Sequence, residues 1–153
     1  MATDPSAAIE LLQPGELPEV VDLLRRAALP PDDLEHHQET LLVARSASRV
    51  VGCAGLELYG ESALLRSVAV EADWRGRGLG VALTRAALDL AGQRGVRRVY
   101  LLTETAGEFF PRFGFRSIER AAAPPEVQQS VEFMCVCPET AEAMLLELEP
   151  GGR

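Results

Sequence analysis

The chain has 153 residues, of which 47% are hydrophobic and 25% are charged, and its formal net charge at pH 7 is -8. This length and composition are typical of a folded globular chain, so we expect a single domain over residues 1–153. The acidic balance argues against nucleic acid as a partner, because phosphate binding needs cationic side chains that displace counterions.

Hydrophobic periodicity and turn residues predict the elements in chain order. They are a strand at 9–12, a helix at 17–28, a short helix at 31–38, strands at 40–44, 50–58 and 64–70, a helix from 79 that Gly95 closes, a strand at 99–102, a short helix at 107–112, strands at 115–119 and 131–136, and a C-terminal helix from 138 to about 148. This order indicates an α/β fold with a mixed sheet of about seven strands, mostly antiparallel in its first half and flanked by helices.

Three cysteines, Cys53, Cys135 and Cys137, cannot all pair, and the first residues lack the regions of a signal peptide. We therefore expect a cytoplasmic protein. No apolar run approaches the roughly 20 residues that span a bilayer, so no membrane partner is expected. Cys135 and Cys137 share one face of a predicted strand. Binding of a soft metal or a trivalent arsenical by this pair is the less common interpretation. Packing under the C-terminal helix is the commoner one, and no metal site is predicted.

A glycine-rich turn, Arg75-Gly76-Arg77-Gly78-Leu79-Gly80, joins the strand at 64–70 to the helix that follows. Glycines there leave main-chain N–H groups accessible at the positive end of the helix dipole, which is a geometry that binds a pyrophosphate. The spacing matches neither the dinucleotide fingerprint nor the phosphate loop, and many such turns bind nothing. Between Asp73 and Arg98 there are six arginines against two acids, a basic region that favours a polyanionic ligand.

The pattern Arg75-x-x-Gly78-x-Gly80 resembles the acyl-CoA motif of the GNAT superfamily of N-acetyltransferases, and Arg112-Phe113-Gly114-Phe115 resembles the segment before its sixth strand. The resemblance implies a GNAT fold with splayed fourth and fifth strands and acetyl-CoA as cosubstrate. It further implies that main-chain groups of the strand hold the pantetheine arm and that amides of the turn hold the pyrophosphate. The residues implied in binding the cosubstrate are Val68, Ala69, Val70, Arg75, Gly76, Arg77, Gly78, Leu79, Gly80, Val81 and Phe110.

Such enzymes are held to let a neutral amine attack the thioester directly in a ternary complex, which needs a proton acceptor and a donor for the thiolate. The N–H of Val70 is implied to polarise the thioester carbonyl. The family's usual acid, a tyrosine, falls at Phe110, which has no hydroxyl, and Tyr59, Tyr100 and Thr103 are the substitutes. Glu57, Glu104 and Glu108 are candidate bases near strand ends, of which we select Glu104.

Arg66 is predicted by strand alternation to share a face with Leu64, Val68 and Val70, where a charge needs an anionic partner. That partner is either the carboxylate of an amino-acid-like substrate, with Glu57 and Thr103 also in the substrate site, or a structural acid or water. His36 and His37, on a predicted helix outside the motif, are interpreted as ordinary surface or half-buried residues.

Two further segments, Tyr100-Leu101-Leu102-Thr103 and the stretch from Glu132 to Pro138, resemble small stand-alone transferases described as arsenic-resistance or N-acetylglutamate-synthase-like. That resemblance implies an amino acid or analogue with an anionic tail as acceptor. Two alternatives stay open, a non-catalytic acyl-CoA-binding sensor and a protein or peptide N-acetyltransferase. Family members often dimerise, so a homodimer stays open as well.

Overall fold

The computed structural model describes residues 7–104, 108–130, 133 and 141–148. Its elements are β1 (Ala8–Leu11), α1 (Leu17–Arg26), η1 (Leu34–Thr40), β2 (Leu41–Ser46), β3 (Arg49–Tyr59), β4 (Ser62–Val70), η2 (Ala72–Trp74), α2 (Leu79–Gln93), β5 (Arg98–Thr103), η3 (Phe110–Phe113), β6 (Arg116–Ile118), η4 (Arg120–Ala122), α3 (Pro125–Gln128) and β7 (Glu142–Glu147), where η marks a 3₁₀ helix. None of the helices so described is long and apolar enough to cross a membrane.

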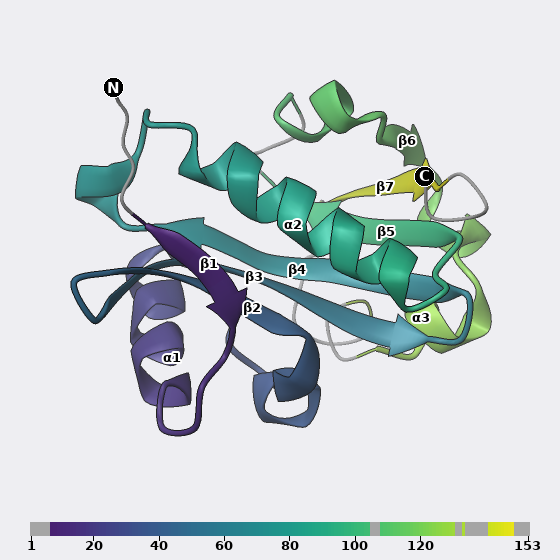
Figure 1. The fold of residues 1–153 in the computed structure, drawn as a ribbon. Helices are drawn as coiled ribbons and strands as arrows, with labels where there is room; N and C mark the ends of the chain where they lie inside the picture. The colour runs from purple at the N-terminus through teal and green to yellow at the C-terminus, as the bar shows by residue number, and fades with distance from the viewer. Residues whose placement is uncertain (1–6, 105–107, 131–132, 134–140, 149–153) are drawn as a thin grey trace. The chain divides into compact units, whose positions relative to one another are not determined.

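The strands among these residues form one seven-stranded mixed sheet in the order β1-β2-β3-β4-β5-β7-β6 (Figure 1). β1 with β2 and β2 with β3 are antiparallel pairs, as are β5 with β7 and β6 with β7, whereas β4 and β5 run parallel. This arrangement confirms the predicted mixed α/β fold. The chain groups into two compact units, Met1–Leu56 with Ser67–Leu88 and Glu57–Arg66 with Asp89–Arg153.

The core of the first unit lies between α1 and the strands of that unit. α1 begins after the turn at Pro14-Gly15, carries a proline in its first turn and has Arg25 and Arg26 in its last, as expected for a helix of this polarity. Apolar residues recur along it at helical spacing and face the sheet. The buried cluster consists of Val20, Leu23, Leu24, Leu34, Leu41, Val43, Val50, Cys53 and Ala69.

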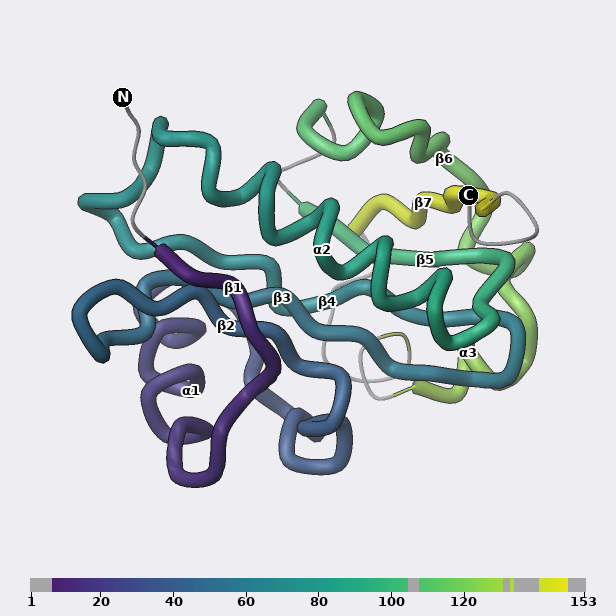
Figure 2. Tube along the Cα trace, viewed as in Figure 1, coloured from purple at the N-terminus to yellow at the C-terminus, as the bar shows by residue number. Residues whose placement is uncertain are grey.

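The second unit contains the parallel pair of strands and the end of the sheet. β4 and β5 are in register from Ser62 opposite Arg98 to Leu64 opposite Tyr100, while β5 stays paired with β7 along its whole length. Figure 2 shows β5, β7 and β6 side by side in this unit. The short parallel register agrees with the splay that the family resemblance implies for the fourth and fifth strands. A second buried cluster covers these strands, made of Leu64, Tyr100, Ala123, Val127, Phe133, Ala143 and Leu145.

The predicted C-terminal helix is wrong over Glu142–Glu147, which is strand β7. Its sequence, Glu-Ala-Met-Leu-Leu-Glu, consists of strong helix formers, so intrinsic propensity favours a helix. The segment instead pairs on both sides, with β5 and with β6, and a strand buried on both faces carries a continuous apolar run rather than an alternating one. The strand predicted at 131–136 lies outside the described residues except for Phe133, and Cys135 and Cys137 lie outside them as well.

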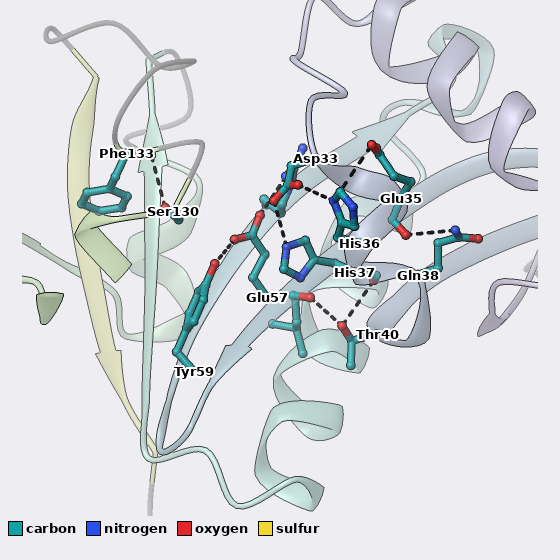
Figure 3. A network of polar contacts seen from close by, with 12 residues as sticks. Asp33, Glu35, His36, His37, Gln38, Thr40, Glu57, Tyr59, Ser130 and Phe133 are labelled. Atoms are coloured by element: carbon teal, nitrogen blue, oxygen red, sulfur yellow. Dashed lines mark hydrogen bonds and ion pairs between the residues drawn. The ribbon is translucent and has the colours of Figure 1, made fainter. Parts of the chain in front are cut away.

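The short helix predicted at 31–38 is the 3₁₀ helix η1, and it begins at Leu34 because Asp33 has a left-handed backbone with φ of +67°. The Asp33 carboxylate contacts both histidines (Figure 3), with Oδ1 2.6 Å from Nδ1 of His36 and Oδ2 3.2 Å from Nε2 of His37. The hydrogen bond and the negative charge of Asp33 raise the pKa of His36. Burial raises the pKa of Asp33, but its hydrogen bonds with the two histidines outweigh this and leave that pKa below its ordinary value.

Gly52 in β3 has no room for a side chain, since an added Cβ would lie 2.8 Å from Cδ1 of Leu83 and 3.2 Å from the carbonyl oxygen of Ala69. We expect Gly52→Ala to lower the free energy of unfolding by ~1–3 kcal/mol through overpacking. Gly92 in α2 has nothing within 4 Å of such a Cβ, so Gly92→Ala is the matched control. Because alanine favours a helix more than glycine does, this variant raises the free energy of unfolding by up to ~1 kcal/mol. Urea unfolding followed by circular dichroism measures both, and effects of the same sign would contradict the packing argument.

We also expect Asp33→Asn to lower the pKa of His36 toward its ordinary value, measured by NMR titration of the imidazole protons. The control is Glu35→Gln, which removes a carboxylate 4.0 Å from the same nitrogen and has the smaller effect. Because folding raises the pKa of His36, the contact stabilises the fold below the ordinary histidine pKa of ~6.5, and this contribution is lost as the pH rises through the raised value. A His36 pKa that Asp33→Asn leaves unchanged would contradict the assignment.

Candidate active site

The turn from β4 to α2 runs through left-handed backbone at two glycines. Gly76 has φ of +80° and Gly78 has φ of +83°, and nothing lies within 4 Å of a Cβ built on either residue. A residue with a side chain would be strained at these angles, which explains glycine at both positions. Residues 75–78 are exposed, and the main-chain N–H of Arg75 donates to the carbonyl oxygen of Ala72 at 3.3 Å.

The electrostatics of this turn favour an anion. α2 has 15 residues and no acidic side chain in its first turn, so nothing there offsets the positive end of the helix dipole. Nε of Arg75 donates to the carbonyl oxygen of Val70 at 3.1 Å, and the guanidinium of Arg77 lies 4.8 Å from the centre of the Trp74 ring. Two arginines and a helix N-terminus thus lie together on an exposed turn, a combination that binds phosphate groups.

The strand that feeds the turn is irregular at Ser67, whose φ is +61°. Ala69 is buried in the core of the first unit, whereas Val68 and Val70 are half-buried. A left-handed residue inside a strand interrupts the regular alternation of faces. The predicted alternation, which sets Arg66 on the same face as Val68 and Val70, is therefore broken at Ser67. The sequence does not indicate this break, because serine is not a typical left-handed residue.

Within the second unit, Arg66 is paired with a buried carboxylate. Its Nη1 donates to Oε2 of Glu57 at 2.8 Å, and the side chains are 1% and 0% exposed. The hydroxyl of Tyr59 donates to the other carboxylate oxygen, Oε1, and Figure 3 shows these two side chains pointing toward each other. Of the two partners that the sequence allowed for Arg66, the structure contains the structural acid. Opposite charges on either side of a two-residue hairpin turn are the signal that could have found this pair.

The other predicted residues lie at the end of β5 and in η3. Thr103 ends β5 and is half-buried, and Glu104, the next residue, is exposed, as is Glu108. Phe110 is buried and makes edge-to-face contacts with Phe109 and Phe115, with ring centres 5.0 and 5.7 Å apart. Its ring therefore has a packing role in this unit.

Tyr100, one of the substitutes for the missing acid, is 4% exposed in the core of the second unit. Burial raises the pKa of its phenol, since the ionised form loses hydration. A buried phenol with a raised pKa is a poor proton donor for a ligand in solvent, so the structure disfavours Tyr100 in that role.

Comparison with known proteins gives a family. Residues 37–117, or 81 of the 153, match the family model described as acetyltransferase (GNAT) domain. An uncharacterized N-acetyltransferase from Chlorobaculum tepidum is 31% identical over 97 residues, which are 63% of this chain and 62% of that protein. An amino-acid acetyltransferase from Mycobacterium tuberculosis is 40% identical over 81 residues, which are 52% of this chain and 45% of that one. The chain thus spans less than two thirds of the length of these curated relatives.

Two solved structures are similar to this chain over nearly all of its length. N-acetylglutamate synthase from Neisseria gonorrhoeae, complexed with coenzyme A and N-acetyl-glutamate, has a TM-score of 0.82 at 19% identity over 97% of this chain and 36% of that one. A Mycobacterium tuberculosis protein in complex with CoA has a TM-score of 0.79 at 25% identity, and the match covers 93% of this chain and 99% of that one. The first shows the likeness of fold, and the family match covers more than half of the sequence. The chain belongs to the acetyltransferase (GNAT) domain family.

Proposed function

We propose that the protein transfers the acetyl group of acetyl-CoA to the primary amine of an amino acid, or an amino-acid analogue with an anionic tail, in a ternary complex. The observation that carries this proposal is the open turn at Gly76 and Gly78 before α2, in a chain that belongs to the GNAT acetyltransferase domain family. The amino-acid acetyltransferase among its relatives supports the acceptor class. An arsenic-containing amino-acid analogue is one acceptor of this class, and the proposal includes a single domain acting in the cytoplasm.

The cosubstrate would lie along β4 and the turn. Main-chain groups of Val68 and Val70 hydrogen-bond the pantetheine arm, and the N–H of Val70 stabilises the negative charge that develops on the thioester oxygen. The amides from Arg75 to Val81 hold the pyrophosphate at the positive end of α2. Ala69 and Phe110 complete this set as packing neighbours. No metal has a step in this chemistry, because the thioester is already activated toward an amine.

The acceptor would be held by Arg66, with Glu57 and Thr103 as further substrate contacts. A guanidinium presents its five donors in a planar fork, a geometry that suits carboxylates. In this proposal the contact with Glu57 orients Arg66 toward the carboxylate of the acceptor. The proton of the amine then has two candidate acceptors, the exposed Glu104 after β5 and the buried Glu57.

A second candidate function is an acyl-CoA-binding sensor without catalysis. The phenylalanine at position 110, where the family resemblance implies a tyrosine hydroxyl, is the observation that favours it. A sensor would bind acetyl-CoA and turn over no amine, so the two candidates differ in one assay.

The cosubstrate site is tested with two glycine variants at opposite ends of α2. Gly78 and Gly95 have φ of +83° and +82°, and both have open space around an added Cβ. Alanine at φ above zero is strained by about 1–2 kcal/mol, so both variants carry a similar backbone penalty. We expect Gly78→Ala to weaken acetyl-CoA binding at least tenfold by calorimetry, and Gly95→Ala to keep the wild-type affinity. Equal affinities of the two variants would argue against the turn as the binding site.

The acceptor site is tested by release of free CoA thiol from acetyl-CoA with a panel of amines. The panel contains glutamate, glutamine, a phosphinothricin-like amino acid, a polyamine and a short peptide. We expect turnover with an anionic amino acid, and Arg66→Lys should raise its KM about tenfold or more, because lysine keeps the charge and loses the fork. The KM for acetyl-CoA serves as the control. An Arg66→Lys variant with an unchanged KM for the anionic acceptor would remove Arg66 from the acceptor site.

A further inference from the structure

Glu57 is the centre of a buried polar group in the hairpin of β3 and β4. Each of its carboxylate oxygens has its own donor, Nη1 of Arg66 for Oε2 and the Tyr59 hydroxyl for Oε1. Glu57 and Arg66 are buried, whereas Tyr59 is half-buried. Of the three side chains, Tyr59 is therefore the most exposed within its unit.

A buried ion pair contributes little net free energy to holding two strands together. Moving a carboxylate and a guanidinium out of water is unfavourable by several kcal/mol per ion, and apolar residues of similar volume often give equal or higher stability. Stability alone does not explain an ion pair whose acid also accepts a hydrogen bond from a phenol at the surface. A phenol that donates a hydrogen bond to a carboxylate can, by contrast, pass its proton to that carboxylate and accept another proton at the same oxygen.

We propose that Tyr59 and Glu57 form the proton path of acetyl transfer, with Tyr59 as the residue that meets the acceptor amine and Glu57 acting through it. This inference rests on the proposed function. Tyr59 packs against the buried cluster that contains Leu64 and Tyr100, which are opposite each other on β4 and β5. Arg66 directly precedes Ser67 on β4, two residues before Val68, where the proposed pantetheine contacts begin.

The chemistry balances with no other reactant. The amine nitrogen attacks the thioester carbon with its lone pair, and one N–H proton moves to the Tyr59 oxygen as the Tyr59 proton moves to Oε1 of Glu57. The tetrahedral intermediate collapses, the C–S bond breaks with its electron pair on sulfur, and the amide remains. The proton on Glu57 returns through Tyr59 to the thiolate, which leaves as the thiol of CoA. One path thereby serves as base and acid, and no hydroxyl is needed at Phe110.

The experiment compares the two tyrosines of the sequence. Tyr59→Phe and Tyr100→Phe each remove one oxygen, and both are assayed by thiol release with acetyl-CoA and L-glutamate or L-glutamine. We expect Tyr59→Phe to lower kcat about 100-fold or more, the usual size of a general acid–base contribution, with KM for acetyl-CoA within about twofold of wild type. Tyr100→Phe keeps the wild-type kcat. Glu57→Gln combined with Tyr59→Phe is expected to lower kcat no further than Tyr59→Phe alone, since the two act as one unit.

Each outcome decides something. A Tyr59→Phe variant that keeps the wild-type kcat overturns the proton path and leaves the proposed function standing. A larger loss in Glu104→Gln than in Tyr59→Phe also overturns it, in favour of the exposed carboxylate. A wild-type protein that binds acetyl-CoA and acetylates neither amino acid overturns the amino-acid part of the proposed function, and the proton path falls with it. Circular dichroism of each variant shows that a lost activity is not a lost fold.

Discussion

The main chain between β4 and α2 passes through left-handed conformations at Gly76 and Gly78, and this constraint governs what the turn can contain and bind. A residue with a side chain would be strained at both positions by the backbone angles, although the space around them is open. The turn is exposed before α2, and no acidic side chain in the first turn of that helix offsets the positive end of its dipole. The anion site is therefore a property of the backbone, and the arginines around it add charge to a geometry that already exists.

The buried pair of Glu57 and Arg66 follows a different principle. A backbone anion site needs accessible N–H groups, but a side-chain ion pair in a core needs exclusion of water and a complete set of hydrogen bonds. The hairpin provides both, because Glu57 has a donor for each oxygen. The half-buried Tyr59 donates to the same carboxylate, so these two buried charges are linked to a partly exposed group.

The contrast between the turn and strand β7 shows where reasoning from sequence succeeds. Gly78 is informative because only a residue without a Cβ adopts its conformation at low energy, so its identity reports local geometry. The residue types of β7 do not indicate its backbone conformation in this way. Alanine, methionine, leucine and glutamate favour a helix in isolation, and they form a strand because β5 and β6 supply hydrogen-bond partners from distant parts of the chain.

Sequence by itself determined the mixed α/β class, the positions of the strands up to β5 within a few residues, the glycine turn and the family resemblance, because periodicity and glycine positions are local properties. The tertiary structure alone decided that Glu142–Glu147 is a strand, that Ser67 interrupts β4, and that Arg66 is held by Glu57 and, through it, by Tyr59. These three features depend on pairing, packing and charge compensation between residues that the chain brings together only when it folds. A residue's own type does not say which of several possible partners it meets, and this is the physical reason that the contacts of Glu57 with Arg66 and Tyr59 are settled only by folding.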